Sequence, residues 1–269
     1  DIEQFITYPV EIEMANLPGV KEIRSISKFG LSVVTIVFDD DLGTYLPRQL
    51  IAEKIKAASE KIPEGFGTPE MGPITTGLGE IYQYTLEVKP QFRNNYSITD
   101  LRTIQDWIVK RQLSGINGVV EINTWGGYLK QYEISIRPSE LKAMNCSLTE
   151  IFTALEKNNS IAGGAYIEKT NQSYFIHGKG KVNSIQDIEN IKKKNTNGLP
   201  VLIKNIAKVQ FGHANRFGAI TGNGEGEKVL GQVMMLKGAN SKQVISDVKD
   251  RVAEIQKSLP EGVYINGFL

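Results

Sequence analysis

An internal repeat is the feature that most constrains the fold of this chain. Residues 17–20 and 116–119 each close a run of apolar residues at helical spacing and lead into a strand-like run. Gly19 and Gly118 stand where a helix C-cap glycine belongs, because only glycine enters the left-handed conformation cheaply. The two glycines lie about 100 residues apart, the length of a small domain. The sequence therefore predicts two copies of one structural unit.

A second pair of matching turns indicates that the two copies differ in length. Pro63 and Pro260 each begin a Pro-Glu-Gly turn that ends a run of apolar residues at helical spacing. These prolines lie about 200 residues apart, so the second copy must hold about 100 additional residues. We therefore predict an inserted module that spans roughly residues 138–228.

Both copies have the predicted order helix, strand, strand, helix, strand. Strands are expected at residues 21–26 and 31–38 in the first copy, and at 120–124 and 132–136 in the second. A further strand, residues 81–88, opens the second copy, which then follows the split β-α-β or ferredoxin-like plan. The predicted fold class is α+β: two ferredoxin-like subdomains, the second interrupted by a small α+β subdomain.

Both ends of the chain suggest a segment of a longer protein. Ile2, Ile6, Val10 and Met14 predict a helix at the very start, and residues 263–269 predict a strand at the other end. The first copy lacks its opening strand, which is expected if the chain begins inside that subdomain. A natural chain with processed ends is the alternative.

The insert is expected to begin with a helix that still packs on the second copy. Residues 147–150 form a capping box, Ser-x-x-Glu, before an apolar helical run. The predicted subdomains are therefore residues 1–80 for the first, residues 81–159 and 228–269 for the second, and residues 160–227 for the insert.

The insert itself is rich in Gly, Asn and Lys and has only short predicted elements. We expect strands near residues 173–178 and 199–203 and one short helix over residues 185–191. The lysine run 192–194 is expected to be the solvated end of that helix, where the helix dipole favours cations.

Composition excludes several classes of protein. The 31 basic and 30 acidic side chains give a net charge of +1, which argues against a nucleic-acid or anionic-membrane binder. The apolar runs are far shorter than the ~20 residues that cross a bilayer. The single cysteine, Cys146, excludes intrachain disulfides and cysteine-rich metal clusters.

Motifs for catalysis are weak throughout the chain. The glycine-rich residues 222–226 lack the Lys-Ser/Thr of a phosphate loop and fit a hairpin tip better. Ser139 and Lys142 match Ser-x-x-Lys without the companion motifs of that hydrolase class. His177 and His213 have no cysteine or histidine neighbour at zinc-ligand spacing. We therefore expect no enzymatic activity and no cofactor.

Glu80 is the single candidate metal ligand. It follows the glycine-flanked loop 76–79 at the mouth of the predicted strand 81–88. A carboxylate in this position can serve as a hard oxygen ligand for a divalent cation. A solvated glutamate that closes a loop is the alternative.

The methionines do not form the pattern expected for a soft metal. A Cu(I) site needs several converging sulfur atoms. Met234 and Met235 are neighbours in a predicted strand and must point to opposite faces. Core packing explains all five methionines, Met14, Met71, Met144, Met234 and Met235.

Four stretches carry a resemblance to a known family: residues 6–38, 77–84, 101–107 and 115–119. In this order they resemble heavy-metal efflux pumps of the resistance-nodulation-division (RND) superfamily. The resemblance implies that the chain is the first large periplasmic loop of such a pump, with two N-terminal porter subdomains and an inserted docking subdomain. Members are proton-driven homotrimers of the inner membrane that work with a periplasmic adaptor and an outer-membrane channel.

The resemblance also favours one branch of the family. Members that export cobalt, zinc, cadmium or nickel tend to carry the Gly-Leu-Gly-Glu of residues 77–80, whereas Cu(I)/Ag(I) members rely on methionines. It implies that Glu80 contributes to the path of a divalent cation, while the proton-relay carboxylates lie outside this chain. The alternatives are the equivalent fragment of a drug or organic-substrate pump and a free-standing ferredoxin-like ligand-binding sensor.

Overall fold

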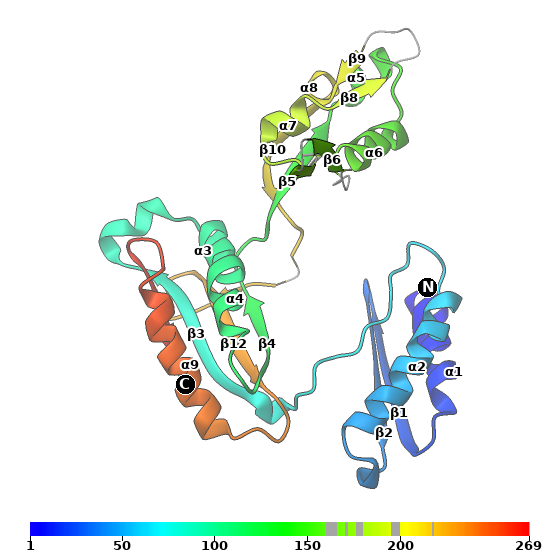
Figure 1. The fold of residues 1–269 in the computed structure, drawn as a ribbon, viewed down its shortest axis with the longest axis vertical. Helices are drawn as coiled ribbons and strands as arrows, with labels where there is room; N and C mark the ends of the chain where they lie inside the picture. The colour runs from blue at the N-terminus through cyan, green and yellow to red at the C-terminus, as the bar shows by residue number, and fades with distance from the viewer. Residues whose placement is uncertain (160–165, 170–171, 176–179, 195–199, 217, 269) are drawn as a thin grey trace. The chain divides into compact units, whose positions relative to one another are not determined.

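The structure is a computed structural model, shown as a ribbon in Figure 1. It describes residues 1–159, 166–169, 172–175, 180–194, 200–216 and 218–268. The chain forms two compact units. The first consists of Asp1–Ile81, Asn117–Glu121 and Val233–Val244, and the second of Tyr82–Ile116, Ile122–Gln232 and Ile245–Leu269. Among the described residues, no helix is long and apolar enough to cross a membrane.

The first unit contains helices packed on one face of a β-hairpin. The hairpin consists of two antiparallel strands, β1 (Val20–Lys28) and β2 (Leu31–Phe38). The helices are η1 (Glu3–Thr7), a π-helical turn that continues as α1 (Tyr8–Ala15), and α2 (Tyr45–Lys61). A 3-10 turn, η2 (Asp40–Leu42), lies between β2 and α2 in the chain.

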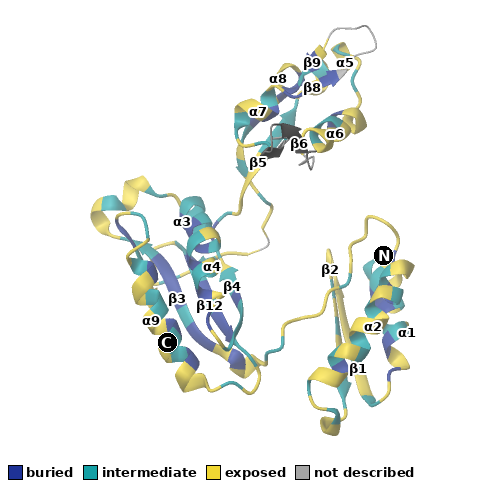
Figure 2. Cartoon of the chain, in the orientation of Figure 1, coloured by how far each residue is buried: buried dark blue, intermediate teal, exposed yellow. Residues whose placement is uncertain are grey.

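A small apolar core holds these elements together. Val10 and Met14 of α1 and Ala58 of α2 are buried, and Val34 and Ile36 of β2 pack against them. Figure 2 shows buried positions along α1. The helical spacing of apolar residues predicted from the sequence therefore marks the inner faces of these helices.

The repeat predicted from the sequence has a counterpart in the backbone. Gly19 and Gly118 have φ angles of 76° and 84°. The glycines of the two Pro-Glu-Gly turns, Gly65 and Gly262, have φ angles of 88° and 86°. All four lie in the left-handed region that glycine adopts without a Cβ clash. The predicted C-cap position of Gly19 and Gly118 is wrong, because the helix C-caps are Asn16 and Ser114 and the two glycines stand in the turns that lead into the next strands.

A five-stranded sheet follows the first hairpin. Its order is β11-β12-β3-β13, and β4 also pairs with β12. The strands are β3 (Glu80–Val88), β4 (Val119–Trp125), β11 (Ile220–Thr221), β12 (Glu227–Met235) and β13 (Val263–Gly267). The predicted strands 81–88, 120–124 and 263–269 are thus present, although Leu269 lies outside the described residues.

Two helical runs accompany this sheet. The first starts after the 3-10 turn η4 (Pro90–Asn95) and continues without a break through α3 (Ile98–Ile104), the π turn η5 (Gln105–Val109) and α4 (Lys110–Leu113). The second is α9 (Ser241–Gln256). Their inward positions are buried, among them Leu101, Leu113, Val248 and Ile255.

The strand predicted at residues 132–136 is present, but its predicted place beside residues 120–124 is wrong. β5 (Lys130–Ile136) pairs with β10 (Ala207–His213) in a separate two-stranded sheet, and the partner of β4 is β12. Ile134 and Ile136 of β5 pack into the apolar core of the insert. β5 therefore packs with residues of the predicted insert and does not pair with β4.

The insert has its own core. Its remaining described elements are α5 (Pro138–Ala143), α6 (Leu148–Lys157), β6 (Tyr166–Lys169), β7 (Gln172–Phe175), α7 (Ile185–Glu189), β8 (Lys192–Lys194), β9 (Pro200–Leu202) and α8 (Ile203–Ile206). The strands β6 and β7 pair with each other, as do β8 and β9. Part of the predicted strand 173–178, residues 176–178, and residue 199 of the other lie outside the described residues.

The helix after the capping box does not pack on the second copy as expected. The capping box itself is confirmed, with Ser147 and Glu150 bonded reciprocally at the start of α6. Ile151 of α6 is buried together with Ile188, Ile203 and other apolar residues of the insert. The apolar face of α6 therefore belongs to the core of the insert.

The lysine run 192–194 is not a solvated helix end. These residues form β8, which pairs antiparallel with β9. Lys193 is only 5% exposed, and its Nζ lies 2.8 Å from Glu150 Oε2. A carboxylate partner offsets the cost of burying the ammonium group. The prediction failed because the lysine run alone does not show that Glu150, distant in the sequence, supplies this partner.

Candidate functional site

Glu80 lies at the junction of a tight turn and a strand. The turn is the 3-10 helix η3 (Gly77–Gly79), and Glu80 is the first residue of β3. The Gly79 amide donates to the Thr76 carbonyl at 2.8 Å and closes the turn. The Glu80 side chain is exposed, and Leu78 beside it is 92% exposed. The carboxylate is therefore available to an ion from solvent.

Two hydrogen bonds hold this loop against the end of β12. Thr75 Oγ1 donates to the Met235 carbonyl at 2.8 Å. The Lys237 amide donates to the Ile74 carbonyl at 3.1 Å. Residues of the same compact unit, far apart in the chain, thus fix the backbone that carries Glu80.

Gly79 is required by close packing in this loop. A Cβ on Gly79 would lie 2.1 Å from Thr75 Oγ1 and 3.0 Å from the Met235 carbonyl oxygen. No larger residue fits without moving the threonine side chain. The glycine before Glu80 therefore lets the loop approach β12 closely.

Glu80 supplies a single carboxylate. Within the part of the chain that the structure describes, no three His, Cys, Asp or Glu residues group together as metal ligands would. A divalent cation of this kind needs several ligands, and six or more for a large hard cation. Further ligands would have to come from outside the described residues.

The methionines are divided between core positions and a groove. Met14 and Met234 are buried, while Met71 is 37% exposed. Met14 and Met71 both line a groove of about 440 Å³ in the first unit, whose other walls include Val34 and Ile51. Two thioethers in an apolar groove fall short of the converging sulfur set that Cu(I) requires.

The glycine-rich motif and His213 lie where the sequence predicts them, in a hairpin turn and on the surface. Residues 222–226 form the turn between β11 and β12, where the Glu225 amide donates to the Gly222 carbonyl at 3.0 Å. His213 is exposed and its ring lies 4.4 Å from that of Tyr128. His177 lies outside the described residues.

A polar cluster around Glu87 was missed by sequence reasoning. Its carboxylate accepts hydrogen bonds from Tyr264 Oη and Thr85 Oγ1, both at 2.9 Å, and from Asn266 Nδ2 at 3.2 Å. Burial opposes the charged form, yet these hydrogen bonds and Lys228 hold the pKa of Glu87 below its usual value. The carboxylate is already saturated with donors, which favours a structural role.

A signal for this cluster exists in the sequence. Thr85 and Glu87 alternate along β3, and Tyr264 and Asn266 alternate along β13, so each pair shares one face. The register that places Glu87 opposite Tyr264 could not be deduced from either strand alone.

Comparison with known proteins extends over the whole chain. The family model described as the AcrB/AcrD/AcrF family matches residues 1–269. "Cation efflux system protein CzcA" of Alcaligenes sp. (strain CT14) is 45% identical over 98% of this chain and 25% of its own length. "Cobalt-zinc-cadmium resistance protein CzcA" of Cupriavidus metallidurans is also 45% identical, with the same shares covered. "Cation efflux system protein CusA" of Escherichia coli (strain K12) is 37% identical over the same shares.

Solved structures give the same result. Crystal form II of a heavy metal efflux pump matches with a TM-score of 0.89 and 32% identity, over 100% of this chain and 26% of that one. The chain thus spans about a quarter of the length of the relatives it matches, 25–27% of the curated ones. These matches confirm the resemblance to heavy-metal efflux transporters found in the sequence. On these grounds the chain belongs to the AcrB/AcrD/AcrF family.

Proposed function

We propose that this chain is the first large periplasmic loop of a proton-driven RND exporter of divalent heavy-metal cations. The observation that carries the proposal is the match, over 98% of this chain, to proteins named for cation efflux and for cobalt, zinc and cadmium resistance. The chain would contribute part of the substrate path and the docking surface. It would act as a transport component, with no catalytic chemistry of its own.

The proposed substrate is a borderline or hard divalent cation such as zinc, cobalt, nickel or cadmium. Identity is higher to the relative named for cobalt, zinc and cadmium resistance, at 45%, than to CusA, at 37%. The exposed Glu80 carboxylate supports an oxygen ligand on the ion's route. Its remaining ligands would come from parts of the exporter outside this chain.

The proposed architecture is two ferredoxin-like porter subdomains with an inserted docking subdomain. Its support is the sheet order β4, β12, β3, β13, in which the second, third, first and fourth strands of one split β-α-β unit lie side by side. We take residues 1–80 as the first subdomain, as predicted. The pairing of β5 with β10 favours a wider insert, residues 130–213, than the predicted 160–227.

The proposed setting follows from the same family membership. The exporter would be an inner-membrane homotrimer with this loop in the periplasm. A periplasmic adaptor and an outer-membrane channel would complete the assembly, and rigid subdomains would open and close a cleft during transport.

The test measures the metal resistance that the full-length exporter confers on a bacterial host without a metal exporter of its own. Glu80→Gln removes the charge and keeps the shape of the side chain. We expect it to lower resistance to zinc, cobalt or cadmium at an unchanged protein level. Glu64→Gln, an exposed carboxylate elsewhere in the first unit, is the matched control.

Each outcome bears on a separate part of the proposal. Wild-type resistance in the Glu80→Gln strain removes Glu80 from the ion path. A wild-type exporter that protects against hydrophobic dyes and not against divalent cations supports the organic-substrate alternative and overturns the metal assignment.

A further inference from the structure

An exposed aromatic and cationic patch in the second unit has no role in the function proposed above. We call it the Trp107 surface, and it consists of Trp107, Arg111, Leu129, Lys130, Tyr132 and Phe211. The four apolar side chains are between 40% and 60% exposed. Large aromatic side chains and arginine are the residues that dominate the energetics of protein interfaces.

The Trp107 surface surrounds a hollow. It has a volume of about 180 Å³ and is lined by Trp107, Leu129, Tyr132 and Phe211, among others. The rings of Tyr132 and Phe211 lie 5.2 Å apart and form one wall. A water molecule occupies about 30 Å³ in the liquid. The hollow is thus large enough for one aromatic side chain and too small for a helix.

The charges around the hollow select an acidic partner. The Arg111 guanidinium lies 4.2 Å from the centre of the Trp107 ring, and Lys130 Nζ lies 4.2 Å from that of Phe211. Among the described residues, neither cation is in an ion pair with a carboxylate, whereas Arg102 is paired with Asp106. Lys130 also lies near enough to Asp100 to help lower the pKa of that carboxyl. Two cations on an apolar rim favour a partner that combines carboxylates with an apolar side chain.

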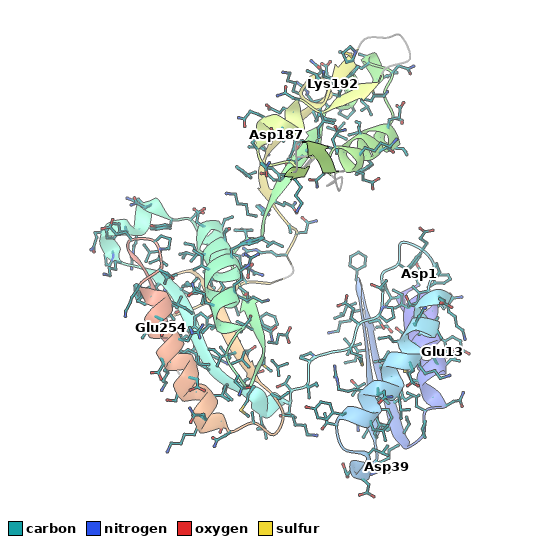
Figure 3. The ribbon with its side chains drawn as sticks, in the orientation of Figure 1. Asp1, Glu13, Asp39, Asp187, Lys192 and Glu254 are labelled. Carbon is teal, nitrogen blue, oxygen red and sulfur yellow. The ribbon has the colours of Figure 1, made fainter. Side chains whose placement is uncertain are left out.

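The first helix of this same chain has that chemistry. Phe5, Tyr8 and Ile12 are 36%, 58% and 42% exposed. Tyr8 and Ile12 lie four residues apart on one face of α1, whereas the Phe5 ring packs on Phe66 with the ring centroids 5.6 Å apart. Residues 1–20 contain four carboxylates, Asp1, Glu3, Glu11 and Glu13, and no lysine or arginine. Figure 3 labels Asp1, just before η1, and Glu13 on α1. Glu13 is in an ion pair with Lys61 of α2. The helix is therefore an acidic element through Asp1, Glu3 and Glu11, and Tyr8 and Ile12 are its exposed apolar side chains.

We propose that the Trp107 surface of one copy binds the acidic face of the first helix of a second copy. The Tyr8 side chain would enter the hollow, and Glu3 and Glu11 would approach Arg111 and Lys130. The two surfaces differ, so the contact is heterologous and joins copies into a ring when the rotation closes. This inference rests on the homo-oligomer in the proposed function and names the surfaces that join its copies.

The first test is self-association of the 269-residue chain, measured by sedimentation equilibrium at low and high salt. We expect association that weakens as salt screens the charges. Arg111→Glu with Lys130→Glu should weaken it about tenfold or more. Lys242→Glu with Lys249→Glu, two exposed lysines of α9, is the matched control and should leave it unchanged. Circular dichroism verifies that each variant is folded.

A charge swap makes the test specific for the two surfaces. Glu3→Lys with Glu11→Lys should weaken association as strongly as the reversal at Arg111 and Lys130. A mixture of the two variants should associate again, because each then offers the other a complementary surface. Failure of the mixture to associate, with both variants folded, contradicts the proposed pairing.

Photo-crosslinking identifies the occupant directly. A benzophenone amino acid at Leu129 of the full-length protein should crosslink to residues 1–20 of a second copy. A crosslink that maps to a different protein, or to another part of the second copy, overturns the proposal. A trimer that confers zinc resistance while lacking this crosslink would overturn the docking surface alone and leave the proposed transport function intact.

Discussion

Lys193 Nζ lies 2.8 Å from Glu150 Oε2 and so joins the strand β8 to the first turn of α6. Glu150 also accepts the Ser147 amide at 2.8 Å as the acidic half of the capping box. The negative charge of Glu150 therefore stabilises both the N-terminus of α6 and the buried Lys193 ammonium group. This arrangement explains how a lysine that is 5% exposed remains charged inside the core of the insert.

The two partners of this pair should respond differently to substitution. Glu150→Gln leaves the Lys193 ammonium buried without its counter-charge, which destabilises the insert, and we expect Tm to fall by roughly 2–4 °C or more. Lys193→Met replaces the buried charge with an apolar chain of similar length and should leave Tm nearly unchanged. Calorimetry of both variants measures this, with Glu156→Gln on the same helix as control. Equal losses in the two variants would contradict the explanation.

The same pair predicts a pH dependence. The hydrogen bond from Lys193, with that from the Ser147 amide, lowers the pKa of Glu150 to about 2 from an ordinary 4.5. A carboxylate whose folded pKa is depressed contributes stability above its unfolded pKa and loses it as pH falls through the folded pKa. The difference in Tm between wild type and Glu150→Gln should therefore be constant above pH ~5 and shrink toward pH ~2. If the Tm difference between wild type and Glu150→Gln stays the same from pH ~5 to pH ~2, the loss of stability comes from the changed shape of the side chain and not from its charge.

A buried hydrogen bond in the second unit gives a third prediction. Tyr84 Oη lies 3.0 Å from Gln105 Oε1, and both side chains are 0% exposed. Burial raises the pKa of Tyr84 far above its usual value, so the hydroxyl stays protonated. Tyr84→Phe leaves the buried amide without this partner and should cost about 1–3 kcal/mol of unfolding free energy.

Urea unfolding of a double-mutant cycle measures this coupling. Tyr84→Phe combined with Gln105→Leu removes both polar groups, so the double variant should be more stable than the sum of the single losses implies. Tyr45→Phe, at a tyrosine that is 71% exposed, is the control and should have no effect. Strictly additive losses would show that the two side chains are not coupled.

The loop before Glu80 gives a fourth prediction. Gly79→Ala places a methyl group 2.1 Å from Thr75 Oγ1, so the loop must move or the threonine must give up its bond to Met235. Under the proposed function, we expect this variant in the full-length protein to lower metal resistance as Glu80→Gln does. Thr75→Ala added to Gly79→Ala relieves the shorter contact and should restore part of the resistance. Gly72→Ala, where no atom lies within 4 Å of the new Cβ, is the control.

Local features of the fold were predictable from the sequence because their causes are local. The apolar spacing around Val10 and Met14 identified the buried face of the first helix. The left-handed glycines Gly19 and Gly118 marked matching turns directly before β1 and β4, and Ser147 with Glu150 marked the start of α6. Each of these depends on the conformational preference of a few neighbouring residues.

The candidate site was predictable only as a position. The sequence placed Glu80 at the mouth of a strand after a glycine-flanked turn, and the structure has it there. The bond from Thr75 to Met235 and the tight fit at Gly79 join residues far apart in the chain. Such contacts depend on which segments meet in space, which no local pattern encodes.

The sequence by itself determined the helix at the start of the chain and most of the strands, and it predicted a repeated unit with an inserted module. Only the tertiary structure decided that β5 pairs with β10, that α6 joins the core of the insert, and that Lys193 is buried against Glu150. The physical reason is that periodicity defines the apolar face of an element and not its partner. Partners are chosen when all apolar faces and charges of the chain are buried together, and that choice is a property of the whole fold.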